Sequence, residues 1–140
     1  MSKNFPLIII LICSLLLFPQ SIYSSSDKED KELMEQCRIQ SEERFKETYG
    51  NEITINEEES GVNSYQNHYN KKLKKCFVIF TTNDFTQNNK KRTQKFLFSL
   101  DDNKEYGFFQ SNGTFFCKVM KKKCKSEDEW DLLVKPYLEE

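Results

Sequence analysis

The sequence lacks the signatures of a catalytic protein. It contains one histidine, His68, in 140 residues, and no G-x-S-x-G segment surrounds any serine. Nucleophilic catalysis needs a nucleophile, a base beside it and a third group that orients the base. We can assemble no such set from the residues, so we expect no catalytic residue, no cofactor and no enzymatic activity.

The sequence also lacks the spacing of a metal site. No two of its five cysteines form a C-x-x-C pair, and His68 is the one further nitrogen ligand available. Structural zinc sites hold four cysteine or histidine ligands at short, regular spacings. We therefore expect no metal site.

A long apolar run is missing too. The run Leu7–Phe18 has 12 residues, whereas a helix that spans a bilayer needs about 20. Lys3 precedes this run and the small residues Ser24–Ser26 follow it, which is the order of a cleaved secretory signal. We expect a signal peptide over residues 1–26, cleaved near 24–26, no transmembrane anchor after cleavage, and one α+β domain over 27–140.

Four cysteines remain once Cys13 leaves with the signal. An even number in an exported protein indicates two disulfides. Three pairings are possible, and the spacing favours Cys37 with Cys76 and Cys117 with Cys124. In the chain-entropy account, the two loops would contribute about 4 and about 2.5 kcal/mol.

Helical patterns occupy both ends of the expected domain. The range Asp27–Tyr49 has no glycine or proline, and apolar residues recur in it every four or eight positions, which predicts an amphipathic helix. Near the C-terminus, Ser126–Glu129 is a capping box. The apolar stripe that starts at Trp130 predicts a second helix, which should end or kink near Pro136.

The middle of the chain alternates aromatic and β-branched residues with polar turns, as strands do. The expected strands are Tyr65–Tyr69, Lys75–Thr82, Gln94–Leu100, Glu105–Gln110 and Thr114–Met120. Short connections at Asn83–Lys91, Asp101–Asn103 and Asn112–Gly113 predict hairpins. The fold class is α+β: an N-terminal helix, a four- to five-stranded antiparallel meander, a C-terminal helix and two disulfides.

Charge is distributed unevenly. Residues 27–60 carry 5 basic and 12 acidic groups, residues 61–125 carry 14 and 4, and residues 126–140 carry 1 and 6. The basic middle favours an anionic partner. A possible binding surface is Tyr65, His68, Tyr69, Lys71, Lys72 and Lys74. Export argues against nucleic acid, so the expected partners are an envelope or extracellular protein or an anionic polymer.

Two segments and two residue pairs carry a resemblance: Tyr65–Phe77 (YQNHYNKKLKKCF), Cys124–Trp130 (CKSEDEW), Tyr106-Gly107 and Pro136-Tyr137. In these the chain resembles short exported bacterial proteins of unknown function. The resemblance spans about half of residues 27–140 and implies a bacterial host with an oxidising extracytoplasmic compartment. It implies no activity and no functional residues.

We therefore expect a secreted or periplasmic protein that acts as a binding or inhibitory module. Two alternatives stay open: a small cell-envelope hydrolase that uses His68, and a structural envelope protein. The sequence does not settle the oligomeric state.

Overall fold

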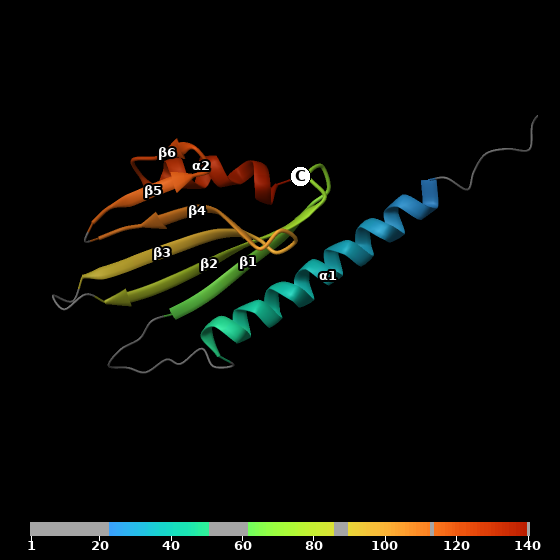
Figure 1. Ribbon diagram of the computed structural model, residues 1–140, viewed down its shortest axis with the longest axis horizontal. Helices are drawn as coiled ribbons and strands as arrows, with labels where there is room; N and C mark the ends of the chain where they lie inside the picture. The colour runs from blue at the N-terminus through green and yellow to red at the C-terminus, as the bar shows by residue number, and fades with distance from the viewer. Residues whose placement is uncertain (1–22, 51–61, 86–89, 113, 140) are drawn as a thin grey trace, which may run out of the picture. The chain divides into compact units, whose positions relative to one another are not determined.

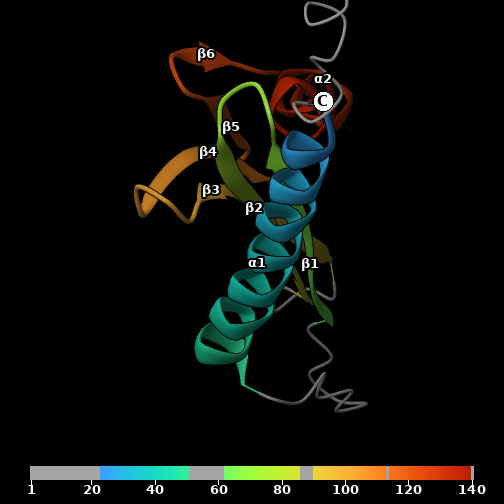
Figure 2. The ribbon, with the colours of Figure 1, turned by 90° about the vertical axis from the view of Figure 1, so that its right-hand side faces the viewer.

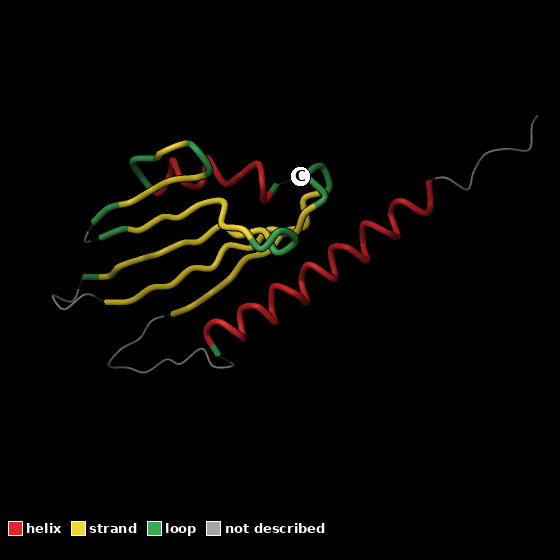
Figure 3. Tube along the Cα trace, in the orientation of Figure 1, coloured by secondary structure: helices red, strands yellow, loops and turns green. Residues whose placement is uncertain are grey.

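The computed structural model describes residues 23–50, 62–85, 90–112 and 114–139. The elements are α1 (Tyr23–Tyr49), β1 (Val62–Asn70), β2 (Lys75–Phe85), β3 (Lys91–Ser99), β4 (Lys104–Gln110), β5 (Phe116–Val119), β6 (Lys122–Lys123) and α2 (Glu127–Leu138) (Figures 1 and 3). Residues Glu32–Glu140 form one compact unit, to which the description below refers. The expected signal peptide falls almost wholly on residues 1–22, outside the described residues.

The six strands form one antiparallel sheet in the order β1-β2-β3-β4-β5-β6. This confirms the α+β class, the two helices and the meander. Within the described ranges the strand count is six, because the chain after β5 turns back for the two-residue strand β6. So short a strand leaves no alternation to detect in the sequence. β1 and β2 are also longer than predicted, and the predicted hairpin at Asn83–Lys91 includes residues 86–89, which lie outside the described residues.

Both faces of the sheet are covered at β2. Phe77 and Ile79 point to one face and belong to a core cluster that includes Trp130 and Val134 of α2. Cys76 points to the other face, where it clusters with Cys37 of α1. We call these the α2 face and the α1 face. Figure 2, turned by 90° from Figure 1, shows α2 nearly end-on.

The disulfide between Cys37 and Cys76 fixes α1 to the α1 face, with 5.3 Å between the two Cα atoms. Ser41, one turn further along α1, is fully buried, and its hydroxyl donates a hydrogen bond to the Cys37 carbonyl at 2.7 Å. The next turn brings the Phe45 ring to 4.9 Å from the Tyr65 ring of β1. The helix therefore packs along β1 and β2 through one stripe of residues spaced four apart.

The second disulfide, Cys117 to Cys124, closes the β5–β6 hairpin, with 5.0 Å between the Cα atoms. Both predicted pairings are thus present in the structure. Just beyond this link, Ser126 caps α2 and accepts a hydrogen bond from the Glu129 N–H at 3.2 Å. The Glu129 carboxylate accepts a hydrogen bond from the Lys125 N–H at 2.8 Å. The predicted capping box has therefore formed, except that Glu129 bonds the N–H of the residue before the cap rather than that of the cap itself.

Asn70 ties the C-terminal end of α2 to the β1–β2 turn. Its side-chain amide is fully buried and donates to the Pro136 carbonyl at 2.9 Å, while its oxygen accepts from the Leu73 N–H at 2.8 Å. Carbonyls in the last turn of a helix lack partners within the helix. Asn70 supplies such a partner for the Pro136 carbonyl. The helix α2 continues through Pro136 and ends at Leu138.

A glycine makes room for the largest buried side chain. Trp130 is fully buried, and a Cβ added at Gly107 would lie 3.0 Å from two atoms of its indole ring and 3.1 Å from the Lys118 carbonyl oxygen. The register shifts at this point: Leu97 pairs with Gly107 but Phe98 pairs with Glu105, which leaves Tyr106 as a bulge. The bulge turns the Tyr106 ring toward Phe77 and Tyr137, with ring centroids 5.2 and 5.6 Å away.

We expect Gly107→Ala to lower the free energy of unfolding by about 1–3 kcal/mol, because the added methyl overpacks the contact with Trp130. Urea denaturation followed by circular dichroism measures this change. In a Trp130→Phe background, which lacks the two contacting indole atoms, the same substitution should cost less. An equal cost in both backgrounds would contradict the proposed clash.

An ion pair fastens the β3–β4 turn to the start of β2. The Lys75 ammonium donates to the Asp102 carboxylate at 2.5 Å and to the Tyr106 hydroxyl at 3.0 Å. The hydrogen bond from Lys75 is the largest cause that lowers the pKa of Asp102 to about 2. Beside it, the Asp101 carboxylate accepts a hydrogen bond from the Cys76 N–H at 2.6 Å.

This ion pair predicts a defined pH dependence. The pKa of Asp102 is lower in the folded protein than its ordinary value of 3.8, so its stabilising effect is complete above about pH 4 and is lost as the pH falls toward about 2. Stability measured for the wild type and for Asp102→Asn should therefore differ at pH 6 and converge near pH 2. A constant difference over this range would exclude the Asp102 carboxylate as the cause.

Candidate binding surface

The structure divides the binding surface that the sequence predicted. Tyr69 is 8% exposed and belongs to the cluster around Cys37 and Cys76, and Tyr65 packs against Phe45 of α1. Both tyrosines therefore contribute to the contact between helix and sheet. His68 is half-buried and pairs in register with Phe77, which places it on the α2 face.

The three predicted lysines lie at the end of β1. Lys71, Lys72 and Lys74 are exposed in the β1–β2 turn, where Lys74 takes a left-handed backbone conformation with φ 51°. They are close in sequence to His68 but do not share its face of the sheet. The six predicted residues thus occupy two faces and a turn rather than one surface.

A different set of residues forms a continuous surface on the part of the α1 face farthest from β1. Phe96 of β3 pairs directly with Phe108 of β4, Phe108 pairs with Lys118 of β5, and Lys118 pairs with Lys123 of β6. Four neighbouring strands thus align two phenylalanines and two lysines in one row, which we call the Phe–Lys row. Neighbouring strands lie about 4.8 Å apart, so the row extends over roughly 15 Å.

The aromatic part of this surface continues onto β5. Ring centroids of Phe96 and Phe108 are 4.8 Å apart, and those of Phe108 and Phe116 are 5.6 Å apart. Phe116 is 46% exposed, and the other two rings are half-buried. Three touching rings that stay open to solvent are an apolar patch of the kind that marks interaction sites.

The lysines beside these rings have no acidic partner within the described part of the chain. Other lysines are paired: Lys75 with Asp102, and Lys95 with Glu127 and Asp131. In contrast, Lys118, Lys121 and Lys123 make no ion pair with any residue of the described ranges, and all are exposed. Like charges directly opposite each other across two strands destabilise a sheet. Lys118 and Lys123 are such a pair, so the hairpin keeps a local positive field at some cost in stability.

A groove of about 460 Å³ lies along β4 and β5 beside the row. The residues that line it are Lys104, Glu105, Tyr106, Gly107, Phe108, Phe116, Lys118, Met120 and Lys121. It is therefore partly apolar, and its three lysines outnumber its one acidic residue, Glu105. An anion in it would meet lysines from β4, from β5 and from the β5–β6 turn.

The end of the groove is shaped by a strained turn. Met120 has φ 51°, a left-handed conformation that side chains other than glycine, asparagine or aspartate rarely adopt. Its N–H donates to the carbonyl of the bulged residue Tyr106 at 2.6 Å. Such strain persists where the surrounding structure enforces it, and it is frequent at functional sites. Here it holds Met120 and Lys121 at the end of the groove.

A sequence signal for this surface was present. Within the strand predicted at Thr114–Met120, alternation places Phe116, Lys118 and Met120 on one face and Cys117 and Val119 on the other. One face thus carries a disulfide and a core residue, and the other an aromatic ring and a cation. What alternation could not reveal is the alignment with Phe96 and Phe108, because the register depends on pairing across strands.

Comparisons with known proteins identify no relative. No family model, no curated protein and no solved structure matches the chain. The resemblance to short exported bacterial proteins thus stays a prediction. Over the described ranges, no helix combines the length and apolar character needed to cross a membrane, and no group of three or more histidine, cysteine or acidic side chains is placed to hold a metal ion.

Proposed function

We propose that the protein is an exported, non-enzymatic binding domain that holds an acidic polysaccharide on the Phe–Lys row and its groove. The observation that carries the proposal is the direct alignment of Phe96 and Phe108 with Lys118 and Lys123 across four strands. Half-buried aromatic rings and lysines without an acidic partner in the described ranges lie there side by side.

The chemistry of an acidic polysaccharide fits both halves of this row. A sugar ring presents an apolar face of C–H groups, which can pack on Phe108 and Phe116, and its carboxylate or sulfate groups can accept hydrogen bonds from lysine ammonium groups. The surface is open and elongated, so a linear polymer could cross several strands. A small ligand would instead favour an enclosed pocket.

Two further features support export. Disulfides persist in oxidising compartments outside the cytoplasm, and both disulfides of this chain hold structural elements together. The expected signal peptide agrees with that compartment, where extracellular polysaccharides are found. His68 does not line the groove, so the binding surface is separate from the residue on which a hydrolase would depend.

We expect the protein to bind polygalacturonate and heparin at low salt, with affinity that falls as salt is raised. Replacing both Lys118 and Lys123 with glutamine should weaken binding by roughly tenfold or more, because the two ammonium groups contact the anions. Phe116→Ser should weaken binding at high salt as well, since a ring contact is not screened. Isothermal titration calorimetry measures each effect.

The matched control is the double variant Lys71→Gln and Lys72→Gln, which removes the same charge from an exposed turn distant in the sheet order. It should keep nearly full affinity. Equal losses in the two double variants would show unspecific attraction and contradict the proposed site. Polyglutamate and a single-stranded oligothymidine serve as competing probes, and tighter binding of either one would overturn the assignment to polysaccharide.

A further inference from the structure

The two edges of the sheet differ in how they are protected. β6 is two residues long and both are lysines, whereas β1 has nine residues, VNSYQNHYN. Natural sheets protect their edges with short strands, charged side chains, prolines or bulges. β6 follows this pattern. β1 has no lysine, arginine, aspartate, glutamate or proline, and its nine register pairs with β2 run without a bulge.

β1 is the first strand in the sheet order, so no strand of the described ranges pairs with its outer side. Its sequence is compatible with pairing to a second β1. An antiparallel pair centred on Gln66 would place Ser64 opposite His68 and Tyr65 opposite Asn67 of the other copy. Each of these pairs is polar without a like-charge contact. The basic turns at Lys71–Lys74 would lie at opposite ends of the paired strands, roughly 30 Å apart, which exceeds the Debye length of about 8–10 Å. A parallel pair would bring these turns together.

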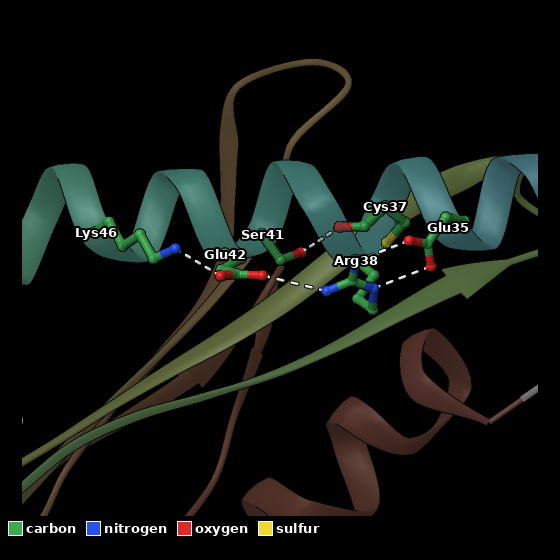
Figure 4. A network of polar contacts seen from close by, with 6 residues as sticks. All are labelled: Glu35, Cys37, Arg38, Ser41, Glu42 and Lys46. Carbon is green, nitrogen blue, oxygen red and sulfur yellow. Dashed lines mark hydrogen bonds and ion pairs between the residues drawn. The ribbon is translucent and has the colours of Figure 1, made fainter. Parts of the chain in front are cut away.

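A row of charges on α1 borders the same edge. Glu35, Arg38, Glu42 and Lys46 are linked in that order by ion pairs of 2.7, 3.2 and 2.5 Å (Figure 4). We call them the α1 charge row. Successive residues of a helix are rotated by about 100° around its axis. Measured from Cys37, the charged residues of the row are rotated toward the same side of α1 as Phe45, which contacts Tyr65 of β1. Arg44, which bonds Asn103 at 3.0 Å, lies in the opposite direction, toward the β3–β4 turn.

The α1 charge row is complementary to itself when reversed. Its signs run negative, positive, negative, positive, so a second copy in the opposite direction places Lys46 opposite Glu35 and Glu42 opposite Arg38. A two-fold axis generates that arrangement, because it brings the same patch of both copies together. The exposed ion pairs within one helix contribute little by themselves, so the groups can exchange partners at small cost.

The same two-fold axis serves both features. The midpoint of the α1 charge row lies between Gln40 and Ser41. Cys37 receives a contact from the Asn67 amide of β1 at 3.8 Å, and Phe45 packs on Tyr65. The midpoint of the row therefore lies near Gln66, which is the centre of β1.

We infer that two copies of the chain associate through antiparallel β1 strands, which join their sheets into one, with the α1 charge rows facing each other across the axis. This inference does not depend on the Phe–Lys row, which lies at the far end of the sheet order. The dimer would carry two such rows, one at each end of the joined sheet.

Sedimentation equilibrium of the purified, disulfide-bonded protein tests the inference. We expect a dimer at tens of micromolar. Gln66→Lys should raise the dissociation constant by at least about tenfold, because two lysines then meet on the axis. The control Thr114→Lys adds the same charge at an exposed position outside β1 and should leave the dimer intact. A monomer for the wild type at 100 micromolar would overturn the inference.

A second variant tests the helices separately from the strand. Exchanging the charges at two positions, Glu42→Lys with Lys46→Glu, keeps the net charge but places like charges opposite each other across the axis. It should weaken the dimer by roughly tenfold. Reversing all four charges of the row restores the alternation and should restore the dimer. A dimer that survives Gln66→Lys but is lost in Phe116→Ser would place the contact on the Phe–Lys row and refute the β1 interface.

Discussion

The contact between Trp130 and Gly107 is the constraint on which much of this structure depends. The indole ring can approach the backbone of β4 closely because residue 107 has no side chain. The bulge at Tyr106 accompanies this contact, and it directs the Tyr106 carbonyl to the Met120 N–H. The strained β5–β6 turn, and with it the position of Lys121 in the groove, therefore follows from the packing of α2 on the opposite face. Core packing and the proposed binding surface are coupled through one strand, β4.

The disulfide between Cys37 and Cys76 has a complementary effect. It holds α1 over β1 and β2. The helix also contacts β3 through Arg44, whose guanidinium lies 5.9 Å from the centre of the Phe98 ring. Phe108 and Phe116 lie on strands beyond β3. A helix fixed at one side of a sheet leaves the other side open, and in this chain the open side carries the aromatic rings and the unpaired lysines. The position of one covalent bond thus determines which half of the α1 face stays open to solvent.

Several elements could be predicted because their signals are local. The capping box at Ser126 and the stripe from Trp130 identify α2, since a helix repeats over three to four residues and its cap is adjacent in sequence. The spacing of the four cysteines favoured the pairing that the structure shows, although two other pairings stayed open. Alternation in β2 correctly indicated a strand covered on both faces. For Tyr65, His68 and Tyr69, in contrast, closeness in sequence does not indicate a shared surface, because neighbours in a strand point to opposite faces.

The sequence by itself determined both helices, five of the six described strands and their order, because each depends on residue types at short or countable spacing. It supplied the four cysteines and favoured one of their three possible pairings. Tertiary structure decided which residues meet. Strands pair through backbone groups that all residues share, so the chain carries no local code for register. The alignment of Phe96, Phe108, Lys118 and Lys123 in one row, and the burial of Tyr69 beneath α1, arise when core packing selects one register from many.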